Sequence, residues 1–425
     1  MPRRAGLSLA DWLARLERLH PSAIELGLDR VRQVRDALGL APAFPLLIVG
    51  GTNGKGSTCA YLEAILGAAG YKTGLYTSPH LLRYNERVRI AGAEARDADL
   101  VAAFERIDDA RGDISLTYFE FGTLGAMLQF IDAGVDVAIL EVGLGGRLDA
   151  VNVFDADAAI VTSVDLDHME YLGDTREQIG FEKAGIYRAG RPAVCADPDP
   201  PARLLAHARA IGADLRCVGR DFSAQIAGER WAFHGCAAHW PDLPLPAMAG
   251  GVQLRNAAGA LAVLDAVRGR LPVGDAAIRQ GLAAAQVPGR FQRIARAPEV
   301  IVDVAHNPEA ARALAATLRA RPATGRTLAV VGMLADKDAA GVLATFDGEI
   351  DAWWTCTPAT PRACDAAALA AILRERAGTA PVRVQPDVSS ALAEARSAAR
   401  EDDRILVFGS FYTVAAVLDH AATQQ

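Results

Sequence analysis

The segment GTNGKGST, residues 51–58, decides the fold of this 425-residue chain. It follows the apolar run FPLLIV at 44–49 and leads into a stretch with helical character at 58–69. Strand, glycine-rich loop and helix in this order are typical of a mononucleotide-binding α/β domain, because the loop amides converge on phosphate oxygens at the positive end of the helix dipole. The alternative is a glycine-rich turn that binds no phosphate.

Two side-chain types in this loop suit phosphate chemistry. Lys55 would neutralise charge on the β- and γ-phosphates, and Ser57 or Thr58 would offer a hydroxyl ligand to Mg²⁺. The loop departs from the plain G-x-x-x-x-G-K-[ST] pattern because Gly56 intervenes between the lysine and the serine. The predicted ATP-binding residues of the loop are Gly51, Thr52, Asn53, Gly54, Lys55, Gly56, Ser57 and Thr58.

Further strands are expected on both sides of this unit. The apolar runs at 135–140 and 158–162 predict buried strands that deliver polar residues at their carboxyl ends, where open α/β sheets bind ligands. The N-terminus predicts an amphipathic helix, with Leu9, Trp12 and Leu16 at helical spacing behind a Ser8 cap. The pattern loosens between 191 and 282 and favours a β-containing accessory region.

A second, smaller α/β domain is expected in the C-terminal third. Strand-like runs alternate there with alanine-rich helical segments, which is typical of a Rossmann-like doubly wound sheet. Proline and glycine interrupt the pattern at 287–290, so the predicted domains are 1–289, a P-loop domain with a mostly parallel sheet, and 290–425. The expected strands are 300–304, 327–331, 352–356, 382–384 and 404–408.

Bulk composition excludes several function classes. Apolar residues make up 51% and charged residues 22%, and the formal charge of −7 comes without a basic block, so no nucleic-acid partner is expected. No apolar run approaches the roughly 18 residues of a membrane helix, which predicts a cytoplasmic protein with no membrane partner. The six cysteines have neither zinc nor redox spacing.

Polar residues at predicted strand ends are the candidates for metal binding. Glu141 ends an apolar strand before a glycine turn, where a carboxylate can reach a metal held on phosphates; a surface acid is the alternative. His168 follows the next strand beside two acids, and its chemistry alone favours a metal ligand and a hydrogen-bonded histidine equally. Ser78 precedes a proline, so it could be a simple turn residue.

One further segment and one further residue suit organic ligands. The segment 117–121, TYFEF, joins aromatic faces to an acid and suits a flat heterocycle, although aromatic core packing is the commoner role. Asp303 ends a strand of the second domain and could accept hydrogen bonds from ribose hydroxyls.

Together with the loop, four further motifs resemble the dihydrofolate synthase/folylpolyglutamate synthase family of the Mur ligase superfamily. The resemblance covers about the whole chain, and the motifs stand in the family's order. They are TSPHL at 77–81, EVGLGGRLDA at 141–150, EKAGI at 182–186 and DVAHNP at 303–308.

This resemblance implies roles for individual residues. It implies a first magnesium on Ser57, Ser78 and Glu141, and a second on His168 and a carbamylated Lys183. It also implies further ATP contacts from Asn256, Arg290, Asp303 and His306, and a catalytic set of Lys55, Asp149, His168 and Lys183. The implied dihydropteroate pocket comprises Thr117, Tyr118, Phe119, Glu120, Leu148, Asp149 and Ala150.

The function expected from the resemblance is ATP-dependent amide ligation through an acyl phosphate. The expected partners are ATP, L-glutamate, dihydropteroate and reduced folates, the expected cofactor is a pair of Mg²⁺ ions, and the expected state is a monomer whose second domain closes the ATP and glutamate cleft. A Mur-type ligase for UDP-muramyl substrates and a P-loop ATPase or switch remain alternatives. Whether the chain makes dihydrofolate, extends polyglutamate tails or does both stays open, and the short chain favours both.

Overall fold

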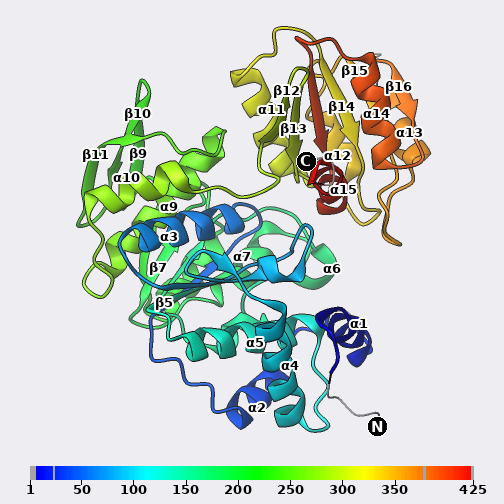
Figure 1. Ribbon diagram of the computed structural model, residues 1–425. Coiled ribbons are helices and arrows are strands. Elements are labelled where there is room, and N and C mark those ends of the chain that lie inside the picture. Colours follow the sequence, from blue (N-terminus) through cyan, green and yellow to red (C-terminus); the bar gives the residue numbers. More distant parts are fainter. Residues whose placement is uncertain (1–5, 23, 377–379, 423–425) are drawn as a thin grey trace. The chain divides into compact units, whose positions relative to one another are not determined.

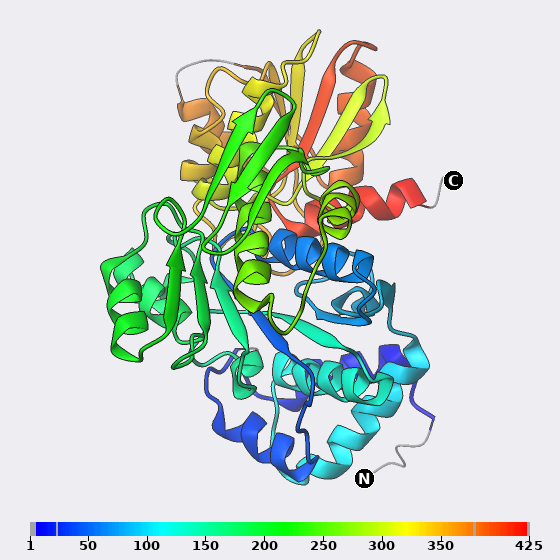
Figure 2. The same cartoon turned by 90° about the vertical axis from the view of Figure 1, so that its left-hand side faces the viewer.

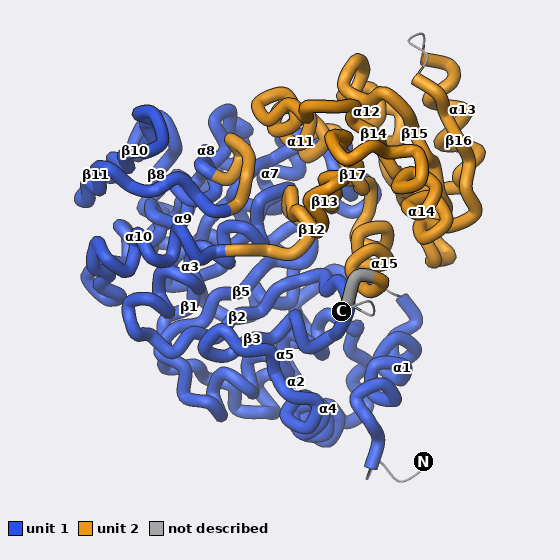
Figure 3. The backbone as a smooth tube through the Cα atoms, turned by 45° about the horizontal axis from the view of Figure 1, so that its top comes forward, with its two compact units in different colours: residues 1–247, 254–285 blue, residues 248–253, 286–425 orange. Residues whose placement is uncertain are grey.

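The computed structural model describes residues 6–22, 24–376 and 380–422, and divides them into two compact units. Unit 1 comprises Met1–Ala247 and Leu254–Ala285, and unit 2 comprises Met248–Gln253 and Gln286–Gln425 (Figure 3). The division near residue 285 lies a few residues before the boundary expected at 289. Unit 2 also includes residues 248–253, which contain the first three residues of α9, Gly251–Val267.

Unit 1 is built on an eight-stranded, mostly parallel sheet of order β4-β3-β2-β5-β1-β6-β7-β8, in which β3 runs antiparallel to both of its neighbours, β2 and β4 (Figure 1). The strands predicted at 44–49, 135–140 and 158–162 are confirmed as β1, β5 and β6. They occupy the middle of the sheet with every residue buried, which explains their continuous apolar runs. The strands are β1 Leu46–Gly50, β2 Thr73–Tyr76, β3 Val88–Ile90, β4 Ala93–Glu94, β5 Val137–Glu141, β6 Ala158–Val161, β7 Pro192–Cys195 and β8 Asp214–Cys217.

Helices cover both faces of this sheet, with α3 and α5 on opposite sides (Figures 1 and 2). The predicted N-terminal helix is confirmed, and Ser8 caps it in a reciprocal hydrogen-bonded box with Asp11. The helices are α1 Leu9–Leu19, α2 Asp29–Ala37, α3 Lys55–Ala68, α4 Asp97–Arg111, α5 Tyr118–Ala133, α6 Met169–Leu172, α7 Arg176–Ala184, α8 Ala202–Ala210, α9 Gly251–Val267 and α10 Asp275–Ala284, with 3₁₀ turns η1 Tyr84–Arg87 and η2 Ala150–Val153.

The loosely patterned region from 191 to 282 divides into two parts. Its first strands, β7 and β8, extend the main sheet. The strands β9 Ser223–Ala227, β10 Arg230–His234 and β11 His239–Pro244 form a separate antiparallel sheet, coloured green in Figure 2. The expectation of a β-containing accessory region therefore holds for the second part only.

Unit 2 contains a six-stranded sheet of order β12-β13-β17-β14-β15-β16, parallel except for the edge strand β12. All five predicted strands are confirmed, and the antiparallel edge strand is an addition that the sequence reading missed. The elements are β12 Gln292–Arg296, β13 Glu299–Asp303, β14 Thr327–Val331, β15 Ala352–Thr355, β16 Val382–Val384, β17 Arg404–Phe408, α11 Pro308–Ala320, α12 Ala339–Ala344, α13 Ala366–Glu375, α14 Val388–Ala398 and α15 Phe411–Ala422.

No helix in the described part of the chain combines the length and the apolar character needed to cross a membrane.

Candidate active site

The phosphate loop connects β1 to α3 through two glycines that no other residue could replace without strain. Gly51 and Gly54 have φ values of +144° and +87°, a region that L side chains rarely adopt. A Cβ at Gly51 would lie 1.9 Å from Oγ1 of Thr162, and one at Gly54 would lie 2.5 Å from Oδ1 of Asn256. The close approach places Asn256, a predicted ATP residue on α9, directly beside the loop.

Lys55 opens α3 and folds back over the loop. Its Nζ donates to the carbonyl oxygens of Gly51 at 3.0 Å and Thr52 at 3.1 Å. No side-chain hydrogen bond caps the start of this described helix. The first-turn N–H groups and the lysine therefore form a positive site suited to phosphate oxygens.

The loop is braced from the side by the segment that leaves β6. The N–H of Thr52 donates to the carbonyl of Ser163 at 2.8 Å, and its hydroxyl donates to the carbonyl of Asp165 at 3.1 Å. The N–H of Asn53 donates to Oγ of Ser163 at 3.1 Å, while Oγ1 of Thr162 donates to the carbonyl of Asn53 at 2.6 Å. These bonds fix the loop backbone independently of any ligand.

Oxygen ligands gather at the first turn of α3. Ser57 and Thr58 are buried, and the Thr58 hydroxyl has no hydrogen-bond partner among the described residues. Glu141 ends β5, the strand beside β1; it is buried, and both its carboxylate oxygens lie 3.8 Å from the position of a Cβ on Gly56. The N–H of Ser78 donates to Oε2 of Glu141 at 3.1 Å, which brings two predicted ligands together.

This oxygen-rich set fits Mg²⁺, which prefers carboxylate and hydroxyl oxygens together with substrate phosphates. Within the described ranges, no group of three or more His, Cys, Asp or Glu side chains forms a metal cluster. A site that takes part of its ligands from hydroxyls and phosphates does not need such a cluster.

The two residues predicted for a second ion differ in exposure. His168 has a left-handed backbone, with φ of 51°, at the start of α6, and its side chain is about one-third exposed. Lys183 lies in the last turn of α7 and is buried, although exposure is the rule for lysine.

Two of the predicted pocket residues have a structural role that the sequence reading missed. Thr117 and Glu120 form a capping box at the start of α5: the Thr117 N–H donates to Oε2 of Glu120 at 2.7 Å, and the Glu120 N–H donates to Oγ1 of Thr117 at 3.2 Å. Arg30 also pairs with Glu120 at 3.2 Å. The T-x-x-E spacing is a known helix-start signature and could have revealed this role.

Four of the other predicted pocket residues, Phe119, Leu148, Asp149 and Ala150, lie at or beside the glycine turn after β5. The ring of Phe119 closes over Gly143, where a Cβ would lie 2.6 Å from Cζ. Asp149 caps η2 and accepts hydrogen bonds from the N–H groups of Leu144 at 2.8 Å and Val151 at 3.1 Å. Burial raises the pKa of Asp149 to about 7, although these backbone hydrogen bonds act in the opposite direction. Its neighbours Leu148 and Ala150 are half-buried and buried.

An aromatic and cationic cluster beside Tyr118 was not predicted. The guanidinium of Arg87 lies over the rings of Tyr84 at 5.6 Å and Tyr118 at 5.4 Å, and its Nε donates to Nδ1 of His80 at 2.7 Å. Burial and the Arg87 charge lower the pKa of His80 to about 4, so the imidazole is neutral. His80 belongs to the TSPHL motif, so the sequence contained a signal that could have predicted its role. No motif in the sequence indicated a role for Arg87.

The predicted ATP residues of unit 2 cluster at the carboxyl end of β13. Asp303 accepts hydrogen bonds from the N–H groups of Phe291 and Ala305, both at 2.8 Å. Burial raises the pKa of Asp303 and the Arg290 charge opposes that shift. Arg290 lies over the ring of Phe411 at 5.5 Å, and the His306 ring lies 6.0 Å from it.

Strand ends β14 and β17 are joined by side-chain hydrogen bonds. Oγ1 of Thr413 donates to the carbonyl of Gly332 at 2.7 Å, and the hydroxyls of Ser410 and Thr413 are 2.8 Å apart. Gly409 has a φ of +114°, and a Cβ there would lie 2.6 Å from the same carbonyl. The segments that follow β14 and β17 are therefore tightly held at the carboxyl edge of the sheet, where open α/β sheets bind ligands.

Comparison with known proteins gives matches along the chain. Residues 49–224 match the Mur ligase middle domain, and residues 289–411 match the Mur ligase glutamate ligase domain. The chain is 48% identical over 417 residues to the dihydrofolate synthase/folylpolyglutamate synthase of Escherichia coli K12, covering 98% of this chain and 96% of that protein.

Solved structures resemble the whole chain. The structure of E. coli FolC in complex with DHPP and ADP superposes with a TM-score of 0.95 at 46% identity and covers both chains completely. A bifunctional folylpolyglutamate synthase/dihydrofolate synthase with Mn, AMPPNP and L-glutamate bound has a TM-score of 0.91 at 47% identity, also with complete coverage.

Proposed function

The chain belongs to the dihydrofolate synthase/folylpolyglutamate synthase family of Mur ligases and is an ATP-dependent ligase, and we propose that it joins L-glutamate both to dihydropteroate and to reduced folates. Relatives with these two activities in their names match the full chain, and one is solved with a nucleotide analogue and L-glutamate together. A Mur-type ligase for other substrates is disfavoured by the same matches.

The observation that carries the proposal is the arrangement around the phosphate loop. Lys55 and the uncapped start of α3 face the loop, and the buried carboxylate of Glu141 ends the neighbouring strand. Positive charge for phosphate and oxygen ligands for a divalent cation are thus held on adjacent strand ends, which suits transfer of the γ-phosphoryl group of ATP.

The proposed reaction has two steps. A carboxylate oxygen of the folate substrate attacks the γ-phosphorus, the bond to the β-phosphate oxygen breaks, and an acyl phosphate and ADP result. The amine of L-glutamate then attacks the acyl carbon, the C–O bond to phosphate breaks, and the amide forms as the amine loses its proton. In this scheme Lys55 offsets the repulsion between the carboxylate and the phosphates.

Magnesium would supply additional charge neutralisation on the phosphates. We assign a first ion to Ser57, Ser78 and Glu141, with Thr58 as a further hydroxyl, and a second to His168 and Lys183. A relative solved with Mn and AMPPNP supports a divalent cation beside the nucleotide but leaves the number of ions open. Mn²⁺ titration against ADP-bound protein would give the stoichiometry, and a single site would contradict the second ion.

Carbamylation of Lys183 is part of this proposal. The lysine is buried, where an ammonium group is costly, and carbamylation would turn it into an anion able to bind a metal. Intact-mass measurement in bicarbonate-containing buffer should show the added mass, and a Lys183→Ala variant should not. An unmodified mass for the unaltered protein would contradict the assignment.

Substrate recognition is proposed for two groups of residues. Phe119 and Asp149 border the glycine turn after β5, and Tyr118 precedes Phe119 at the start of α5; these residues suit the flat pterin ring with its hydrogen-bonding edge. For ATP, we propose contacts from Asn256 in unit 1 and from Arg290, Asp303 and His306 in unit 2. The glutamate site is proposed near the ends of β14 and β17.

The protein is proposed to act as a monomer in the cytoplasm.

Product analysis tests the function directly. The protein is incubated with MgATP and L-glutamate, and either dihydropteroate or a reduced folate; mass spectrometry should find one added glutamate on each, with stoichiometric ADP. Lys55→Ala should abolish both products. Asp149→Ala should retain ADP binding and lose turnover of the pterin substrates. Turnover of neither substrate, or ADP release that does not require glutamate, would contradict the proposal.

A further inference from the structure

The segment that leaves β6, residues 162–168, connects two parts of the proposed site. Its first half braces the phosphate loop, because Ser163 and Asp165 exchange hydrogen bonds with Thr52 and Asn53. Its last residue is His168, the proposed ligand of a second ion. The position of both parts therefore depends on what holds this segment in place.

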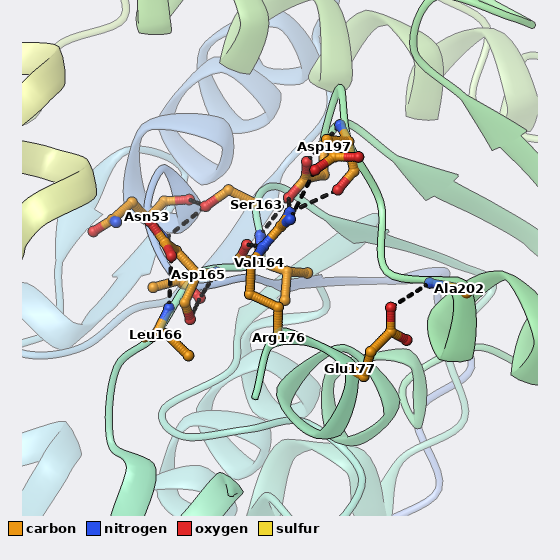
Figure 4. A network of polar contacts seen from close by, with 11 residues as sticks. Asn53, Ser163, Val164, Asp165, Leu166, Arg176, Glu177, Asp197 and Ala202 are labelled. Carbon is orange, nitrogen blue, oxygen red and sulfur yellow. Dashed lines mark hydrogen bonds and ion pairs between the residues drawn. The ribbon is translucent and has the colours of Figure 1, made fainter. Parts of the chain in front are cut away.

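A polar clamp formed by Arg176 and Asp197 holds the two peptide units that flank Val164, in the middle of this segment (Figure 4). Oδ2 of Asp197 accepts the Val164 N–H at 2.6 Å, and Nε of Arg176 donates to the Val164 carbonyl at 2.9 Å. Arg176 and Asp197 are themselves 3.6 Å apart as an ion pair. The backbone N–H and the carbonyl of Val164 are thus each hydrogen-bonded to a charged side chain.

The clamp is itself anchored. Oδ1 of Asp197 accepts the N–H of Asp199 at 2.9 Å, and NH1 of Arg176 pairs with Oδ2 of Asp199 at 2.8 Å. The side chain of Asp197 is only 6% exposed, so its hydrogen bonds form where water competes poorly and charge-assisted bonds are strong.

The elements that carry the clamp come from different parts of unit 1. Asp197 follows β7, the strand next to β6, and Arg176 is the first residue of α7, the helix that also carries Lys183. The clamp thereby joins the ends of two strands to the helix that presents the second proposed ligand.

We propose that Arg176 and Asp197 are positioning residues for the ligase reaction, which hold residues 163–168 so that the phosphate loop and His168 keep their working geometry. The inference rests on the proposed function of this site. Neither residue needs to touch a substrate, because a displacement of about 1 Å in a reacting geometry can lower a rate by roughly 100-fold.

The chain supplies a matched control in Glu177, the residue next to Arg176. Its carboxylate accepts the N–H of Ala202 at 3.0 Å, at the start of α8 (Figure 4), and the N–H of Arg203 at 2.7 Å. It thus performs the same kind of backbone capping from the same helix, but for a different element. A purely structural effect of losing such a cap should appear equally in Glu177→Gln.

The test compares Asp197→Asn, Arg176→Lys and Glu177→Gln in the full-length protein. Asp197→Asn keeps the shape but presents an NH₂ group to one of the two N–H donors, and Arg176→Lys keeps the charge but loses the planar fork that reaches Val164 and Asp199 together. Steady-state kinetics give kcat and KM for each substrate. Electron paramagnetic resonance of free Mn²⁺ gives metal affinity in the presence of ADP without requiring turnover.

We expect both clamp variants to lower kcat by about 10-fold or more and to weaken Mn²⁺ binding, with KM for dihydropteroate within about 2-fold of wild type. Glu177→Gln should change none of these. The double variant should be no worse than the poorer single variant, since one clamp is being broken. If circular dichroism shows that Asp197→Asn does not fold, the kinetics and the Mn²⁺ affinity of Arg176→Lys test the inference.

Wild-type-like kcat and Mn²⁺ affinity in the clamp variants would overturn the inference, and so would an equal loss in Glu177→Gln. If the wild type itself made no amide product, the proposed function would fail instead, and Mn²⁺ binding with ADP would still report on the clamp.

Discussion

Asp149 shows how a single side chain can be held between opposing influences. It is buried, which disfavours the carboxylate, while the N–H groups of Leu144 and Val151 stabilise it. Burial dominates and the pKa rises to about 7. The residue that closes the glycine turn therefore changes its charge near neutral pH.

This raised pKa predicts a pH-dependent stability. Between about pH 4 and 7 the folded protein keeps the Asp149 proton that the unfolded chain releases, so the free energy of unfolding should fall as pH rises, by up to about 1.4 kcal/mol per pH unit. The contribution is fully present below the unfolded pKa of 3.8 and is lost as pH passes through the folded value.

Urea unfolding at a series of pH values measures this effect. Asp149→Asn should flatten the decline in unfolding free energy across the window. Asp29→Asn, at a side chain that is 92% exposed, is the control and should retain the wild-type slope. Equal slopes for Asp149→Asn and the wild type would contradict the assignment.

At the scale of elements, the start of α3 differs from the sequence prediction. The helix was expected from residue 58, yet it begins at Lys55. The prediction was wrong because glycines lower helix propensity and mask the start. In the structure Gly54 takes a left-handed turn beside Asn256, so the backbone enters the helix immediately afterwards.

Gly54→Ala should weaken nucleotide binding, because Gly54 forms the turn between the phosphate loop and α3. The alanine would carry the left-handed backbone penalty of about 1–2 kcal/mol and would also press on Asn256, displacing the loop. Gly70→Ala is matched for backbone strain, with φ of +94°, but a Cβ there has nothing within 4 Å. Calorimetry with ADP should show a loss of about 10-fold or more in affinity for Gly54→Ala only, from displaced phosphate contacts. Unchanged ADP affinity in Gly54→Ala would refute this.

At the scale of the whole molecule, the proposed ATP ligands are divided between two compact units. The phosphate loop and Asn256 belong to unit 1, whereas Arg290, Asp303 and His306 belong to unit 2. If one ATP molecule contacts both sets, binding must restrict the two units to one arrangement. Exclusion of water from an acyl phosphate would give such an arrangement a chemical purpose.

Small-angle scattering tests this expectation. The non-hydrolysable analogue AMPPNP with Mg²⁺ and dihydropteroate should lower the radius of gyration of the wild-type protein. Arg290→Ala, which removes a proposed contact from unit 2, should reduce that change, whereas Arg293→Ala, on the edge strand β12 that follows Arg290, should not. A radius of gyration that does not respond to ligands would count against closure.

Local patterns in the chain were sufficient for the central features. The strands β1, β5 and β6 could be predicted from their apolar runs, because a strand buried on both faces must be continuously apolar. The phosphate loop could be predicted because such a turn needs glycines at positions of positive φ. The five motifs indicate the family, and the rule that open α/β sheets bind ligands at the carboxyl ends of their strands predicts ligand-binding positions for Glu141 and Asp303.

Only the tertiary structure decided which distant residues meet. Asp197 reaches Val164 because β7 pairs with β6, and Arg87 reaches Tyr118 because η1 lies beside the start of α5. Neither contact has a periodicity or spacing in the chain. Whether a segment forms a strand or a loop depends on its neighbours in the sequence, so these elements could be predicted. Hydrogen bonds and ring contacts between distant elements depend on strand register and on packing, so they could not.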